Sequence, residues 1–103
     1  MTILLDYQNH EIRLTNERLA HVHEHAEMLG LDAAIAETLW NPALVIQSQA
    51  DISAALHYRY YLGTRVGDKW LCVVVKYGVL DSFVLTAYLT DKPKKGIQLW
   101  PKP

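Results

Sequence analysis

The chain has 103 residues, half of them apolar, a formal net charge of −1 and one cysteine. This length and composition predict one folded domain, 1–103, and exclude intrinsic disorder and a disulfide-stapled scaffold. No run approaches the roughly 18 apolar residues of a membrane span, and the first residues lack a basic stretch and a cleavage site, so we expect a soluble, cytoplasmic protein without a membrane partner.

The first predicted elements are a small β-hairpin and a helix. Apolar stretches over Thr2–Tyr7 and Glu11–Leu14 flank Gln8–His10, which has the composition of a turn. Thr15 is a suitable N-cap for a helix from Asn16 to about Leu29. Residues at helical spacing give this helix one apolar stripe, formed by Leu19, Val22, Ala26 and Leu29.

A second helix and then a series of strands follow. Gly30 ends the first helix, Asp32 caps a second over Ala33–Trp40, and Asn41-Pro42 stops it. The rest of the chain predicts strands separated by turns, over Ala43–Ser48, Leu56–Leu62, Trp70–Lys76 and Ser82–Thr90. The order of elements predicts an α+β fold, in which two N-terminal helices pack on a four-stranded, or slightly larger, antiparallel sheet.

The strand patterns predict which side chains share a face. Leu56–Leu62 alternates, which places Tyr58 and Tyr60 on one face and Arg59 and Tyr61 on the other. Trp70–Lys76 is apolar on both faces, as is typical of a central strand, and it includes Cys72, which we expect in the core. In the last strand, alternation sets one group of residues against another: Phe83, Leu85, Ala87 and Leu89 against Val84, Thr86 and Tyr88.

Charge is distributed unevenly along the chain. Residues 1–51 carry eight acidic residues and two arginines, whereas residues 52–103 carry eight lysines or arginines and three aspartates. Such asymmetry is found in proteins whose basic half binds a polyanion. It is equally consistent with acidic helices that complement a basic sheet within one fold.

A histidine cluster, His21-Val22-His23-Glu24-His25, is the densest group of chemically active side chains. His21 and His25 are four residues apart, which would place both on one face of a helix. The spacing matches the inverted zinc-peptidase motif, but the third ligand is missing because no glutamate follows Glu37. The alternative is that these are solvated histidines paired with neighbouring glutamates.

A second group of polar side chains is spread over the predicted sheet. It consists of Tyr58, Arg59, Tyr61, Lys76, Thr86 and Tyr88. Cations and hydroxyl donors on neighbouring strands are what phosphate binding requires. Taken singly, the cations are also consistent with solvated surface charges, and the tyrosines with ordinary sheet packing.

The C-terminal tail is basic and contains an aromatic residue. Lys92, Lys94 and Lys95 precede Trp100. Such a tail could steer phosphates and stack on a base, or it could be a solvated terminus with Trp100 folded back on the core. We favour the second interpretation for Trp100 and leave the lysines open.

The order of these motifs resembles a known family. The pattern comprises Arg18-x-x-His21-x-x-x-His25-x-Glu27-Met28, Ile35-Ala36-Glu37-Thr38-Leu39 with Asn41-Pro42, Leu71-Cys72-Val73-Val74-Val75-Lys76, Phe83-Val84-Leu85-Thr86-Ala87-Tyr88, and Lys94-Lys95-Gly96 with Leu99-Trp100. Over residues 12–100 it resembles the phage and bacterial nuclease-like domains of the barnase–EndoU–colicin–RelE (BECR) group, including RelE-like toxins.

The resemblance implies a metal-independent endoribonuclease without a cofactor, a toxin or phage-type enzyme that acts through attack of the 2′-hydroxyl on the adjacent phosphate. It implies RNA as substrate and a cognate antitoxin protein as a possible partner. In this interpretation His21 or His25 transfers protons, Arg59 and Lys76 bind phosphate, and Thr86 and Tyr88 orient it. The expected substrate-binding residues are Tyr58, Tyr61, Lys94 and Lys95.

Two other functions stay open on the sequence. The chain could be a catalytically inactive module of the same fold that binds protein or nucleic acid. It could also be a small metal-binding accessory protein, an interpretation that depends on the histidine cluster alone.

Overall fold

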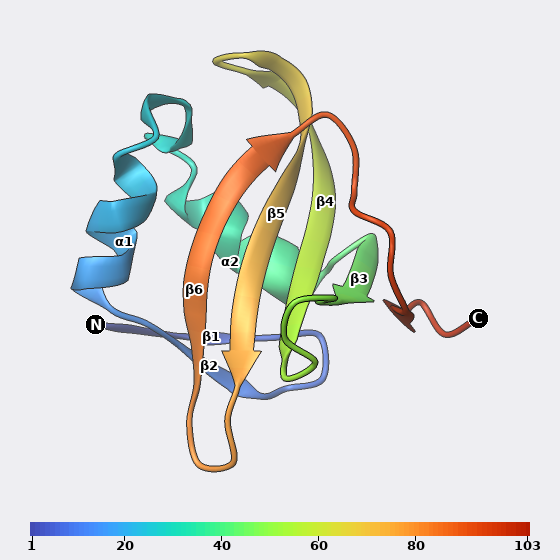
Figure 1. The fold of residues 1–103 in the computed structure, drawn as a ribbon. Coiled ribbons are helices and arrows are strands. Elements are labelled where there is room, and N and C mark those ends of the chain that lie inside the picture. The colour runs from blue at the N-terminus through green and yellow to red at the C-terminus, as the bar shows by residue number, and fades with distance from the viewer.

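The computed structural model describes residues 1–103 as one seven-stranded sheet with two helices (Figure 1). The strand order is β1-β2-β6-β5-β4-β3-β7, and every neighbouring pair is antiparallel except β2–β6. The elements are β1 (Thr2–Leu5), β2 (Glu11–Leu14), α1 (Asn16–His23), a 3₁₀ turn (Ala26–Met28), α2 (Asp32–Trp40), β3 (Leu44–Gln47), β4 (Ala54–Thr64), β5 (Gly67–Tyr77), β6 (Ser82–Thr90) and β7 (Gln98–Trp100).

The predicted fold class was wrong. The sheet is mixed rather than antiparallel and has seven strands rather than about four. The helices are not both N-terminal, because the β1–β2 hairpin, which the sequence did predict, precedes them and belongs to the same sheet. Two segments cause the difference. The β1–β2 hairpin joins the sheet through a parallel pair in which Arg13 lies opposite Phe83, and the tail adds β7 beside β3.

Helix α1 begins as predicted but ends six residues early. The Thr15 side chain accepts a hydrogen bond from the Arg18 backbone N–H at 3.1 Å, which caps the first turn. The helix stops at His23, where the Glu24 and His25 N–H groups donate to carbonyls three residues back, and His25 is extended at φ −82° and ψ 107°. The following 3₁₀ turn brings Met28 into the core, while Leu29 lies exposed.

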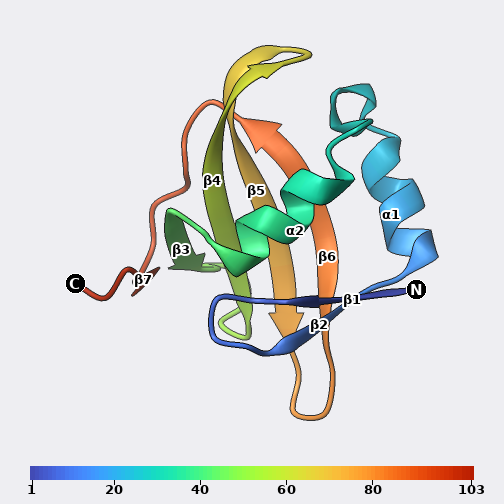
Figure 2. The same ribbon diagram turned by 180° about the vertical axis from the view of Figure 1, so that it is seen from behind.

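The main core lies between the helices and one face of the sheet. Figure 2 shows α2 crossing this face of the strands. The buried side chains come from α1, the 3₁₀ turn, α2 and the strands: Ile12, Leu14, Val22, Met28, Ile35, Leu39, Leu71, Val73, Val75, Val84 and Ala87. Full burial of one such large aliphatic side chain contributes roughly 1.5–3 kcal/mol, so this layer supplies most of the driving force for folding.

A β-bulge in β6 alters the predicted alternation. Val74 pairs with Thr86, but the next residue, Val75, pairs with Val84, so Leu85 is the extra residue on β6. As a result Val84 and Ala87 both lie in the helix-side core, although the sequence pattern placed them on opposite faces. Thr86 and Tyr88 face away from the helices.

A second, smaller apolar cluster lies on the other face of the sheet. It consists of Ile46, Leu56, Tyr58 and Cys72, with Leu44, Trp70, Val74 and Tyr88 packed against it. No helix covers this face, which is turned to the viewer in Figure 1. We call it the open face. The tail runs down from β6 beside β4 and forms part of its border.

The tail is held closely against β3. The Gln47 N–H donates a hydrogen bond to the Ile97 carbonyl at 2.8 Å. A Cβ atom on Gly96 would lie 2.7 Å from Cγ2 of Ile46 and 3.0 Å from the Gln47 carbonyl oxygen, so this approach requires glycine. The tail is therefore an ordered part of the fold. None of the helices has the length and apolar character needed to cross a membrane.

Candidate nucleic-acid interface

The open face is built by the alternation of three neighbouring strands. Across β4, β5 and β6, Tyr58 lies opposite Cys72, which lies opposite Tyr88. Two residues further along β4 on the same face, Tyr60 lies opposite Trp70, which lies opposite Thr90. Two residues back, Leu56 lies opposite Val74, which lies opposite Thr86. The centre of the sheet thus presents aromatic and hydroxyl side chains on a side that no helix covers.

Two aromatic rings in this surface are accessible. Tyr60 is 47% exposed, and its ring lies 5.2 Å from that of the half-buried Trp70 in an edge-to-face arrangement. Trp70 also contacts the buried Tyr58 ring at 6.4 Å. The contacts fix the orientation of Trp70, and such edge-to-face pairs are favourable. A rigid aromatic surface on an open sheet is suited to stacking with planar ligands.

The tail places lysines along the edge of this surface. The Lys94 backbone N–H donates a hydrogen bond to the Tyr58 hydroxyl at 3.1 Å. Lys92, Lys94 and Lys95 form no ion pair with a carboxylate, whereas Lys69 pairs with Asp91 and Lys76 with Asp51. The three central strands carry one acidic residue, Asp68, beside the β4–β5 turn. The electrostatic balance at this edge is therefore positive.

The hydroxyls and the thiol at the centre of the open face are neutral at ordinary pH. Burial raises the pKa of Tyr58 to about 12 and that of the Cys72 thiol to about 11. Burial also raises the pKa of Tyr88. The positive charge of Lys94 opposes the shift in the pKa of Cys72. These groups can donate and accept hydrogen bonds, but Cys72 is wholly buried and protonated and is not a nucleophile.

Lys76 lies on the open face near the C-terminal end of β5, where its ammonium group pairs with Asp51. The hydrogen bond from Lys76, followed by those from Ser53, lowers the pKa of Asp51 to about 2. Lys76 faces Phe83 of β6 across the strand pair. Of the predicted site residues, Tyr58, Lys76, Thr86, Tyr88, Lys94 and Lys95 thus lie on or beside the open face.

Arg59 and Tyr61 lie on the opposite face and hold α2. Arg59 donates to the Asn41 carbonyl at 2.9 Å and pairs with Glu37 at 3.3 Å. The Tyr61 hydroxyl donates to Glu37 at 2.6 Å. This hydrogen bond, more than the charge of Arg59, lowers the pKa of Glu37, while burial raises the pKa of Tyr61 to about 12. Strand alternation separates these two residues from Tyr58, Lys76 and Thr86.

The histidine cluster does not lie at the open face either. His21 and His25 are exposed, with ring centres 6.5 Å apart, and His21 is 3.6 Å from Glu24. His23 bonds to Asp32 at 2.6 Å. They belong to α1 and the segment after it, whose buried residues pack on the helix side of the sheet. No three His, Cys, Asp or Glu side chains are grouped so as to hold a metal ion.

A polar network that the sequence did not reveal joins the β1–β2 turn to β4 and β5. The buried Asp6 accepts hydrogen bonds from the Tyr77 hydroxyl at 2.7 Å and from the Gln8 and His10 backbone N–H groups at 2.9 and 2.8 Å. His10 Nδ1 lies 3.0 Å from the same carboxylate, and His57 Nε2 lies 3.0 Å from the Tyr77 hydroxyl. The only available signal was an aspartate two residues before the predicted turn over Gln8–His10, because aspartate side chains often accept backbone hydrogen bonds at turns.

Burial is the largest single influence on the pKa values of the groups in this network. It raises the pKa of Tyr77, as does the hydrogen bond to Asp6, and lowers that of His57 to about 4. For Asp6, burial acts to raise the pKa, but the hydrogen bonds from Tyr77, His10 and Gln8 together outweigh it and leave the pKa lowered. Asp6 is therefore a buried anion whose charge is stabilised by donors from the turn and from β5.

Comparisons of the chain with models of protein families, with curated proteins and with solved structures find no match.

Proposed function

We propose that the chain binds single-stranded RNA across the open face of its sheet. The observation that carries the proposal is the Tyr60–Trp70 ring pair, accessible on an uncovered face and bordered by lysines without acidic partners. Bases stack on such rings, and lysines neutralise the backbone phosphates. Single strands fit better than duplexes because stacking requires unpaired, accessible bases.

The first test compares two exposed aromatic residues on opposite sides of the molecule. Tyr60 lies on the open face, and Trp40, which is 55% exposed, lies at the end of α2 on the helix side. Tyr60→Ala should weaken binding of a short labelled single-stranded RNA by roughly 1–3 kcal/mol, the cost of losing one stacked base. Trp40→Ala should leave the affinity unchanged. Fluorescence anisotropy titration measures both.

The outcome that contradicts this proposal is equal affinity for the wild-type protein and Tyr60→Ala, or equal losses in both variants. The same titration with DNA of matched sequence and with an RNA duplex defines the ligand class. A preference for duplex RNA would contradict a stacking mode of binding, because paired bases are not available to aromatic side chains.

Cleavage of the bound RNA is the second candidate function. Lys76, Thr86 and Tyr88 occupy one face, which supports the phosphate-binding half of the ribonuclease expected from the family resemblance. The proton-transfer half is not on that face, because His57 lies on the helix side and the other four histidines lie outside the central strands. Incubation of labelled RNA with the protein in chelator, followed by analysis of the product ends for a cyclic phosphate, tests this activity.

A further inference from the structure

His10 is distinguished from the other histidines by the carboxylate behind it. Its Nδ1 faces Asp6 at 3.0 Å, and Asp6 is itself fully buried and held by three further hydrogen bonds. Nδ1 therefore carries the proton, which leaves Nε2 as a hydrogen-bond acceptor. The His10 side chain is 54% exposed, so this nitrogen can reach a ligand.

The other histidines lack this combination. His57 is fully buried, and both of its ring nitrogens face protein groups. His23 uses Nε2 on the exposed Asp32, and His21 lies 3.6 Å from the exposed Glu24. Only the carboxylate beside His10 is withdrawn from solvent and fixed by several donors, which is the arrangement that orients an imidazole for proton transfer.

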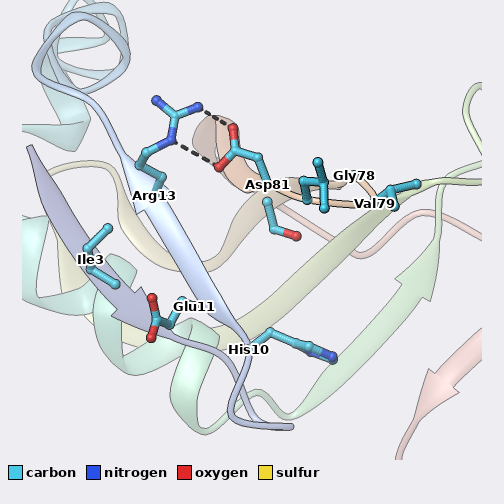
Figure 3. Close-up of a pocket in the computed structure, with 9 residues that line it drawn as sticks. Ile3, His10, Glu11, Arg13, Gly78, Val79 and Asp81 are labelled. Atoms are coloured by element: carbon cyan, nitrogen blue, oxygen red, sulfur yellow. Dashed lines mark hydrogen bonds and ion pairs between the residues drawn. The ribbon is translucent and has the colours of Figure 1, made fainter.

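Two pockets of different character meet at His10. One, of about 280 Å³, is polar and is lined by Arg13 and Glu11 (Figure 3), together with Ser82. The other, of about 320 Å³, is mainly apolar and is lined by Tyr7, Ile52 and Leu99 together with Tyr77. A nucleotide has the same division, with a flat base at one end, a charged phosphate at the other and the ribose between them.

Figure 3 shows Arg13 joined to Asp81 by two interactions at the edge of the polar pocket. Arg13 also lies over the Phe83 ring, at 5.7 Å from its centre, and so connects this pocket with the end of the open face where Lys76 is found. A phosphate here would share the Arg13 guanidinium with Asp81, and the Glu11 carboxylate would oppose it. We therefore expect weak binding of a free nucleotide and slow turnover.

We propose that His10 is the catalytic base of an RNA-cleaving site, with a base in the apolar pocket, the phosphate beside Arg13 and the ribose against His10. This inference rests on the proposed RNA-binding function, because the open face would deliver the strand. His10 Nε2 takes the proton of the 2′-hydroxyl, the O2′–P bond forms and the P–O5′ bond breaks. The same proton then passes from His10 to the O5′ leaving group, so the products are a 2′,3′-cyclic phosphate and a 5′-hydroxyl end.

The test measures cleavage and binding of the same labelled RNA by four variants. His10→Asn keeps an N–H group near Asp6 but has no basic nitrogen, and His10→Gln removes the basic nitrogen in a second way. Both should lose roughly 10²–10⁴-fold in cleavage rate, the usual contribution of a general base, and this loss should far exceed any loss in RNA affinity. His21→Gln and His25→Gln are the matched controls and should cleave as the wild-type protein does.

Each result separates the two proposals. RNA binding without cleavage, cleavage unaffected in both His10 variants, or cleavage abolished by His21→Gln or His25→Gln would overturn the role of His10 and leave the RNA-binding function standing. Cleavage that requires His10 but does not change in Tyr60→Ala would overturn the open face as the binding surface and retain the catalytic base. Absence of both binding and cleavage would overturn both. Thermal unfolding of every variant confirms that the hairpin turn is still folded.

Discussion

The two faces of the sheet use similar residue types in opposite ways. On the helix side, Arg59 and Tyr61 both bind Glu37, and His57 is enclosed between β5 and the β1–β2 turn. On the open face, Tyr60 and Trp70 contact each other but remain accessible, and the lysines of the tail border them. A polar side chain that already has a buried or charged partner stabilises the fold, whereas an unpartnered one on an uncovered face is available to a ligand.

The largest effect should follow from a cavity on the helix side. Leu39 is fully buried between α2 and the sheet, so Leu39→Ala should lower the free energy of unfolding by about 2–5 kcal/mol. Tyr60→Ala, a larger truncation on the open face, should lower it by only about 0.5–1.5 kcal/mol, because the ring is 47% exposed and its main contact is the edge-to-face pair with Trp70. Urea denaturation of both variants measures the difference. Equal losses would mean that the open face is as much a core as the helix side.

The next effect concerns pH and the buried His57. Burial lowers its pKa to about 4, against a value near 6.5 in an unfolded chain. Between these pH values the unfolded chain binds a proton that the folded protein does not, so stability from this group is complete above about pH 6.5 and is lost as the pH falls to about 4. The loss should be of the order of 3 kcal/mol.

Comparison of the wild-type protein with His57→Gln isolates this contribution. Glutamine does not titrate, so the free energy of unfolding of the variant should depend less on pH between about 4 and 6.5. Two parallel pH profiles in this range would show that His57 is protonated equally in the folded and unfolded states. That result would mean that burial of His57 on the helix side does not shift its pKa and so does not distinguish the two faces.

Local patterns in the sequence predicted part of this comparison. Alternation in β4 correctly placed Tyr58 and Tyr60 opposite Arg59 and Tyr61, because side chains on a regular strand change face at every residue. The N-cap at Thr15 and the central position of β5 were also correct. The sequence interpretation nevertheless treated Arg59 and Tyr58 as members of one site, and the structure separates them.

Features that depend on distant residues could not be predicted in this way. The bulge at Leu85 changes the face of the residues before it, and it is visible only once β6 is paired with β5. The parallel contact between Arg13 and Phe83 joins segments seventy positions apart. Likewise Asp6 meets Tyr77 across 71 positions, so neither residue signals the network by itself.

A smaller effect is expected from the lysines of the tail. For single strands, each neutralised phosphate contributes a slope of about −0.7 to the dependence of log affinity on log salt. Lys94→Ala combined with Lys95→Ala should reduce the slope by up to about 1.4. Arg18→Ala on α1 should leave it unchanged, because this residue belongs to the helix layer. If Arg18→Ala reduced the salt slope by as much per charge as the lysine variant does, RNA would be attracted by the total charge of the protein and not by the tail.

The smallest effect should come from releasing a cation on the open face. Lys76 is held by Asp51, and Asp51→Asn removes the negative charge while keeping an oxygen that can accept the Ser53 hydrogen bonds. The variant should bind RNA more tightly than the wild-type protein at low salt. Its affinity should also fall by a further two- to threefold, roughly, when the salt rises from about 50 to 200 mM, because one added phosphate contact steepens the slope by about 0.7. The matched control is Asp91→Asn, which releases Lys69, the neighbour of Tyr61 in the sheet. Because Tyr61 and Lys69 belong to the helix-side register, this release should not strengthen binding. An equal gain in both variants would show that RNA responds to net charge alone, whereas a gain confined to Asp51→Asn would place the path of the strand along the open face as far as Lys76.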